Sequence, residues 1–127
     1  MPLIRNFLGP ATRPAWSTVT SAGIFRVPAV NGRFDCHYHD CNEYWLFFAG
    51  KGKATSEGQT FYIKAGDILA TRAGDEHDII EVYETLEAFW FEDATPAGGK
   101  VGHLHRSPEK AKGHAVPHLP LPPDFPT

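Results

Sequence analysis

The chain reads FDCHYHDCNEYWLFFAG from residue 34 to residue 50, a stretch that combines metal-binding side chains with a strongly apolar run. His37 and His39 are two residues apart, so on a β-strand both point to one face, about 6–7 Å apart. Glu43 lies four residues further on, about 13 Å away along a straight strand. The intervening Asp-Cys-Asn at 40–42 is typical of a turn. If the chain reverses there, Glu43 opens a neighbouring antiparallel strand and faces both histidines.

A second group of residues completes this pattern downstream. Glycine turns at Gly66 and Gly74 enclose a short apolar run, and His77 begins the next one. A strand that starts at His77 can cross the same space as the two earlier histidines. Three imidazoles and one carboxylate suit Fe, Mn, Ni, Cu or Zn, and suit Mg or Ca poorly. We therefore expect one divalent transition metal per chain (Fe, Mn, Ni or Zn). The predicted ligands are His37, His39, Glu43 and His77.

The spacing of these residues resembles a known family. His-x-His-x3-Glu-x6-Gly at 37–50 is similar to the first motif of the cupin superfamily, and Gly-x7-Gly-x2-His at 66–77 looks like the second. The resemblance covers about residues 15–92. It implies an all-β fold, namely a cupin-type jelly-roll β-barrel.

The chain departs from the cupin pattern at three positions. Gly32 lies one residue closer to His37 than the leading glycine of the first motif usually does. Arg72 and Glu81 stand where the second motif usually has proline and asparagine. None of the three is a predicted ligand, so the departures concern the loops more than the metal site.

The segment 103–109 also spells His-x-His-x3-Glu. It runs into Pro108 and a charged Glu-Lys-Ala-Lys stretch, and no strand pattern follows it. Seven histidines in one chain make such a fragment easy to obtain by chance. We interpret it as part of a solvated tail rather than as the metal site.

Short runs of β-branched and aromatic residues separated by glycine turns are typical of a sandwich or barrel. No amphipathic helix is expected. A turn is predicted at 50–52, and Tyr83-Glu84 is expected to separate the last two strands. The predicted strands are 16–27 (two short strands or one bulged strand), 34–39, 43–49, 53–56, 59–63, 68–71, 77–82 and 86–91.

We expect residues 1–127 to form a single cupin domain, with a core at about 15–92. Composition changes in the extension at 94–127, which holds seven prolines and four histidines. Proline favours extended backbone here. This irregular, Pro-rich C-terminal arm is predicted to lie over the barrel or across a dimer, with a disordered tail as the alternative.

Composition and charge exclude several classes of protein. The net charge of −3 gives no basic face for nucleic acid. The chain has no run of 18 apolar residues for a membrane span and no signal-peptide pattern at its start. We therefore expect a cytoplasmic protein without a nucleic-acid or membrane partner. Cys36 and Cys41 are expected to be thiols.

Strand alternation predicts what surrounds the metal. Trp45 and Phe47 share the face of Glu43 and give the pocket an apolar wall. Ile79 and Glu81 share the face of His77, so an inward Glu81 can act as an acid or base, with a solvated carboxylate as the alternative. Arg72 is a candidate to hold a substrate carboxylate, although a solvated loop arginine is the simpler interpretation.

Cupins with these ligands include dioxygenases, isomerases, decarboxylases and lyases, and also proteins without known catalysis. We predict a metal-dependent small cupin enzyme that acts on a small polar organic molecule. The aromatic wall slightly favours non-haem dioxygenase-type chemistry over isomerase or lyase chemistry. The alternative is a non-catalytic module that binds a small ligand or a metal. The outward apolar face of Tyr44–Phe48 predicts a homodimer.

Overall fold

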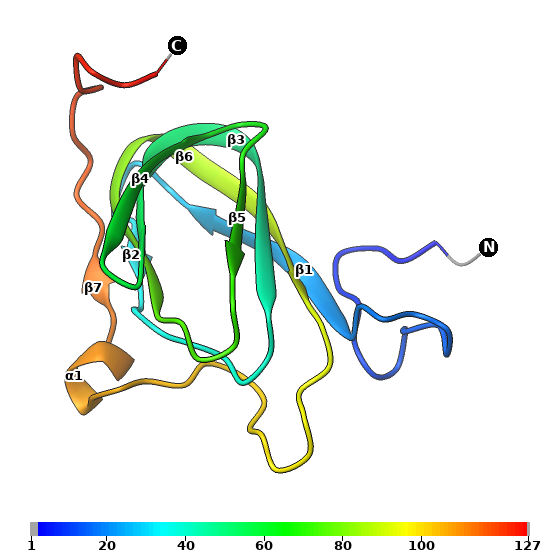
Figure 1. The fold of residues 1–127 in the computed structure, drawn as a ribbon. Coiled ribbons are helices and arrows are strands. Elements are labelled where there is room, and N and C mark those ends of the chain that lie inside the picture. Colours follow the sequence, from blue (N-terminus) through cyan, green and yellow to red (C-terminus); the bar gives the residue numbers. More distant parts are fainter. Residues whose placement is uncertain (1–2, 127) are drawn as a thin grey trace.

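The computed structural model describes residues 3–126, and it confirms the predicted all-β, jelly-roll class of the cupins (Figure 1). One short helix, α1 (Pro108–Ala111), interrupts the C-terminal arm. The strands are β1 (Ser21–Val27), β2 (Arg33–Phe34), β3 (Glu43–Ser56), β4 (Gln59–Lys64), β5 (Ile68–Thr71), β6 (His77–Glu92) and β7 (His114–Ala115).

Two long strands, β3 and β6, organise the main sheet. They pair antiparallel along nearly their whole lengths, β1 extends the sheet beyond β6, and β4 and β5 each pair with a different half of β3. The five strands curl around one interior, as Figure 1 shows. The hydrogen-bonded ladder does not close on itself, and a small β2–β7 ladder lies beside it.

The turn predicted at 50–52 is wrong, because β3 continues through it. Gly50 adopts φ +90, and the β3–β6 register shifts between Phe47 and Ala49 and again between Ala49 and Lys51. A Cβ at Gly50 would lie 2.0 Å from the carbonyl oxygen of Thr85. Glycine therefore permits a β-bulge in which the two backbones approach closely, rather than a reversal of the chain.

The break expected between the strands 77–82 and 86–91 is also absent, since β6 is continuous from His77 to Glu92. A further register shift lies between the pairs Lys53–Glu81 and Ala54–Ile79, so one residue of β6 is inserted without a partner. Each inserted residue exchanges the inward and outward faces of the strand. Accordingly, Ile79 is buried before the inserted residue and Val82 after it, so the buried face moves from odd-numbered to even-numbered positions.

The core fills the space inside the curled sheet. Most of it comes from the two long strands, and β1, β4 and the C-terminal arm contribute one residue each. Its buried members are Val27, Trp45, Phe47, Ala54, Ile63, Ile79, Val82, Leu86, Ala88 and Val116.

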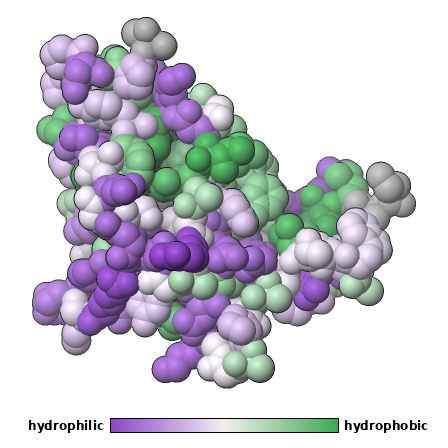
Figure 2. All heavy atoms as spheres, viewed as in Figure 1, coloured by the Kyte–Doolittle hydropathy of each residue, from purple (hydrophilic) through white to green (hydrophobic). Residues whose placement is uncertain are grey.

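The opposite face of the sheet is also apolar. Ile24, Phe89, Leu46 and Ile68 are successive partners across β1, β6, β3 and β5, and they form one row. Ile68 is 65% exposed and Phe89 is 37% exposed. Hydrophobic residues gather in the upper middle of the view in Figure 2. Together with Tyr44 and Phe48, the row forms what we call the outer apolar face.

The two ends of the chain behave differently. At the N-terminal end, Leu8 pairs with Ala22, but β1 begins only at Ser21, so the strand predicted from residue 16 is too long. The C-terminal arm runs back along the barrel, where β7 pairs with β2 and where Val116 and Phe125 are buried.

In the part of the chain that the structure covers, no helix is long and apolar enough to cross a membrane.

Candidate metal centre

The segment that carries the first two predicted ligands is less regular than the expected strand 34–39. β2 ends at Phe34, and two isolated bridges follow. His37 N–H donates to the carbonyl of His77 at 3.1 Å, and His77 N–H donates to that of His37 at 2.8 Å. These bonds attach the segment to the start of β6. They bring together two predicted ligands that are 40 residues apart in the sequence.

The turn before Glu43 is held by Asn42. The Asn42 N–H donates to Asp93 Oδ1 at 2.9 Å, and its side-chain amide donates to Asp93 Oδ2 at 2.8 Å. The Asn42 side-chain oxygen accepts from Ala73 N–H at 2.9 Å. This Asx residue therefore fixes the reversal, and Glu43 begins β3 with its carboxylate facing inward.

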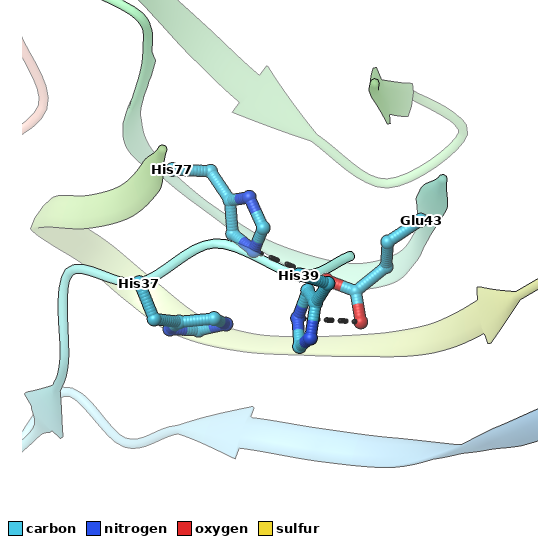
Figure 3. A group of neighbouring side chains, drawn as sticks. All are labelled: His37, His39, Glu43 and His77. Carbon is cyan, nitrogen blue, oxygen red and sulfur yellow. Dashed lines mark ion pairs between the residues drawn. The ribbon is translucent and has the colours of Figure 1, made fainter. Parts of the chain in front are cut away.

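The four predicted ligands converge on one point, as Figure 3 shows. Their ligand atoms all lie within 4.8 Å of one another, and each residue is at most 4% exposed. His39 Nε2 lies 3.2 Å from Glu43 Oε2, and His77 Nε2 lies 3.2 Å from Glu43 Oε1. Such a buried group of three imidazoles and one carboxylate is the donor set expected for a transition metal.

Hydrogen bonding leaves the Nε2 atoms available for a metal. Each Nδ1 lies near a backbone carbonyl: His37 near Asp35 at 2.6 Å, His39 near Gly102 at 3.0 Å, and His77 near Asp75 at 3.3 Å. Within residues 3–126, the buried Nε2 atoms of His39 and His77 have no hydrogen-bond partner. Buried polar atoms without partners are unusual. A metal ligated through Nε2, with Nδ1–H bonded to a carbonyl, accounts for both observations.

The electrostatics of the site favour an ionised Glu43. Burial by itself raises the pKa of this carboxyl, but the adjacent imidazoles of His39 and His77 hold the pKa below its usual range. Burial lowers the pKa of His37, which favours the neutral, ligating imidazole. Burial and the neighbouring Glu43 carboxylate raise the pKa of Glu92 to about 8. The site therefore favours an ionised Glu43 beside a protonated Glu92.

A cavity of about 110 Å³ opens onto two of the four residues, His37 and Glu43. Trp45 lies in its wall, and the Trp45 Nε1–H donates to Glu43 Oε1 at 2.8 Å. Phe47 and Ile79 point inward as expected, but both belong to the buried core rather than to the lining. The cavity is lined by Phe25, Phe34, His37, Glu43, Trp45, Trp90, Glu92 and His103.

Two predicted pocket residues lie elsewhere. Glu81 Oε1 accepts from the Tyr83 hydroxyl at 2.8 Å, and its other oxygen lies 3.5 Å from Lys53 Nζ. The inserted residue in β6 turns Glu81 away from the face of His77. The Arg72 side chain is 81% exposed and lies 3.6 Å from Asp75. Neither Glu81 nor Arg72 lines the cavity.

The arm contributes a residue that the sequence alone assigned to a solvated tail. The His103 ring stacks on that of His37, with centroids 3.7 Å apart and planes at 5°. His103 Nδ1 and His105 Nε2 lie 2.9 Å and 2.7 Å from Asp35 Oδ2. The repeated His-x-His spacing was the available signal for this arrangement, and the absence of a strand pattern after it led us to the wrong interpretation.

Glu92 is a second residue of the site that sequence reasoning missed. It ends β6, and its carboxylate lies 3.6 Å from His39 Nδ1. Its register partner across the sheet is Glu43. No local motif marks Glu92, because its place in the site depends on the pairing of β3 with β6.

The curled sheet and the buried His/Glu group define this protein as a cupin. The chain matches the family described as AraC-like ligand binding domain over residues 25–109, and it belongs to that family. The uncharacterized protein y4oW of Sinorhizobium fredii is 37% identical over 71 residues, which are 56% of this chain and 33% of that protein. The chain thus spans about a third of this relative's length.

Solved structures agree with the fold. The DMSP lyase DddQ from Ruegeria pomeroyi superposes with a TM-score of 0.63 at 19% identity, covering 73% of this chain and 46% of that one. A cupin protein from Bacteroides fragilis superposes with a TM-score of 0.56 at 23% identity, covering 82% and 88%. Likeness at this level of identity shows the fold alone.

Proposed function

We propose that this protein is a metal-dependent small cupin enzyme that acts on a small polar organic molecule. The observation that supports this most is the convergence of four buried ligand atoms, two of them imidazole nitrogens without a hydrogen-bond partner, beside an open cavity that His37 and Glu43 line. The metal is one Fe, Mn, Ni or Zn ion per chain. His37, His39, Glu43 and His77 would hold it through Nε2 atoms and a carboxylate oxygen.

When bound, such a metal supplies Lewis-acid polarisation of a substrate oxygen or access to redox chemistry. The chain's own residues limit what reaches it. The cavity of about 110 Å³ leads to His37 and Glu43, and Phe25, Trp45 and Trp90 give it an aromatic wall. The Trp45 Nε1–H bond to Glu43 orients that carboxylate. The aromatic wall keeps our slight preference for dioxygenase-type chemistry over isomerase or lyase chemistry.

The second candidate function is a non-catalytic module that binds a small ligand or a metal. Membership of the AraC-like ligand binding domain family favours this candidate. The same cavity and the same buried ligands serve it, but no turnover would follow binding. The enzyme and the module therefore differ in turnover, and a module that binds only a small ligand differs from the enzyme in metal content as well.

Metal analysis followed by a substrate screen tests the proposal. Protein purified without chelator, or reconstituted with Fe, Mn, Ni and Zn in turn, is expected to carry about one metal per chain. The reconstituted protein is then incubated with small polar organic molecules in the presence and absence of oxygen. Oxygen-dependent turnover supports the dioxygenase, oxygen-independent turnover supports isomerase or lyase chemistry, and saturable binding without turnover supports the module. Failure to hold any of these metals contradicts the metal-dependent enzyme and leaves only a module that binds a small ligand.

Three further features belong to this proposal. We take residues 1–127 to act as one cupin domain, with the extension at 94–127 packed on its barrel. We propose a homodimer that covers the outer apolar face, since several of its large side chains are otherwise more than a third exposed. We also propose that the protein resides in the cytoplasm, which cell fractionation tests.

A further inference from the structure

The C-terminal arm lies directly beside the segment that carries two of the four predicted ligands. Tyr38 N–H donates to the carbonyl of Leu104 at 2.9 Å, and Leu104 N–H donates to that of Tyr38 at 3.0 Å. On the other side, His37 is paired with His77. The ligand segment is thus held between the start of β6 and the arm, and the arm satisfies both backbone polar groups of Tyr38.

The arm also contacts the imidazoles themselves. The carbonyl of Gly102 lies 3.0 Å from His39 Nδ1, and the ring of His103 stacks on that of His37. Asp35, two residues before His37, accepts hydrogen bonds from His103 and His105. A carbonyl on Nδ1 fixes the tautomer and orientation in which Nε2 faces the metal. Two of the four ligands are therefore oriented from the arm.

We propose that Gly102 and His103 are positioning residues of the metal centre, and that docking of the arm sets the metal affinity of the site. Because this inference rests on the proposed function, it assumes the metal site described above. It adds that residues 102–105, which lie outside the sequence stretch with the ligands, are needed for tight binding. The arm then contributes to metal affinity, in addition to packing on the barrel.

Gly102 offers a selective way to test this role. Its backbone adopts φ +97, where L side chains are strained, and a Cβ there would meet nothing within 4 Å. Gly102→Ala therefore acts through the backbone conformation that aims the carbonyl at His39. Gly98 lies in the same arm with φ +84 and equally open surroundings. Gly98→Ala is the matched control, with similar backbone strain and no bond to a ligand.

His103 provides an independent test at the second ligand. The His103 side chain is 53% exposed, so His103→Ala removes little buried surface and should fold. His103→Phe keeps an aromatic ring for stacking on His37 but removes the bond to Asp35. The distances of 2.7 Å and 2.9 Å from Asp35 to the two imidazoles are those of hydrogen bonds. We therefore assign this cluster a positioning role rather than a second metal.

The experiment uses the intact chain, stripped with chelator and titrated with Zn²⁺ against a chromophoric competitor at fixed pH. Gly102→Ala and His103→Ala are expected to weaken Zn²⁺ binding by about 10–100-fold, the range typical of partners that orient ligands. Gly98→Ala should bind Zn²⁺ as the wild type does, and His103→Phe should fall between His103→Ala and the wild type. The melting temperature of each metal-free variant separates a loss of affinity from a loss of folding.

Several outcomes would overturn the inference. Equal affinities of Gly102→Ala and Gly98→Ala, together with wild-type affinity of His103→Ala, would show that the arm does not position the ligands. Two Zn²⁺ ions per wild-type chain, with one lost in His103→Ala, would instead make the Asp35 cluster a second metal site. In both cases the wild type binds metal and the proposed function stands. A wild type that binds no metal would contradict the proposed function and this inference together.

Discussion

The backbones of His37 and His77 bond to each other in both directions, at 3.1 Å and 2.8 Å, and their rings lie 4.4 Å apart. One histidine follows β2, and the other opens β6. The pair therefore connects two distant parts of the chain at the point where the remaining predicted ligands converge. We therefore expect loss of either histidine to disturb both the ligand group and the start of β6.

The first prediction concerns the ligands. His37→Ala, His39→Ala and His77→Ala are each expected to lose most of the bound metal, because each removes one of four donors from a buried site. Elemental analysis of the purified variants measures this. His118→Ala is the control, since its imidazole bonds the carbonyl of Tyr83 and lies outside the ligand group. Loss of metal in His105→Ala, with full metal content in His77→Ala, would show that the other His-x-His motif binds the metal.

The second prediction concerns Glu92 in the metal-free protein. Its folded pKa of about 8 lies above the ordinary 4.5. Between these values the folded state binds more protons than the unfolded state, so stability falls as pH rises. The slope contributed by Glu92 is at most about 1.4 kcal/mol per pH unit. Below pH 4.5 both states are protonated, and the destabilisation is absent.

Denaturant unfolding of the metal-free wild type and of Glu92→Gln from pH 5 to pH 8 measures this effect. The substitution should raise the free energy of unfolding at pH 8 more than at pH 5. Glu84→Gln, on the same strand with a side chain that is 61% exposed, is the control and should follow the wild type. Parallel curves for Glu92→Gln and the wild type would contradict the prediction.

The third prediction is the homodimer. Light scattering at micromolar concentration is expected to give about twice the chain mass of 14.1 kDa. Phe89→Glu should give a monomer, because it places a charge within the outer apolar face. Val30→Glu changes a side chain that is 74% exposed outside that face and should remain dimeric. A monomer mass for the wild type would refute the assembly.

The fourth prediction concerns the C-terminal arm. Truncation after Gly99 should lower the melting temperature and expose dye-binding surface, because Val116 and Phe125 are buried by the arm. Burial of one such side chain contributes about 1.5–3 kcal/mol. In the intact chain, Val116→Ala should lower the melting temperature, whereas Leu121→Ala, at a position that is 49% exposed, should change it little. An unchanged melting curve after truncation would show that the arm adds no stability.

The sequence alone was sufficient for the fold class and for the four residues that the structure brings together. Strand alternation places His37 and His39 on one face, and the Asx turn at Asn42 returns Glu43 to them. Alternation likewise predicted that Trp45 and Phe47 point inward. These inferences depend only on residues a few positions apart, where local geometry is decisive. His77 and the fold class were instead predicted from the spacing of glycines and histidines that resembles the two cupin motifs.

The tertiary structure alone decided the remaining parts of the site. A register shift in the β3–β6 ladder turned Glu81 outward, and no local residue pattern marks such an insertion. Glu92 reached the site because β6 pairs with β3 over its whole length. His103 reached it because the arm folds back onto Tyr38. These placements depend on contacts between residues distant in the chain, which periodicity and spacing do not encode.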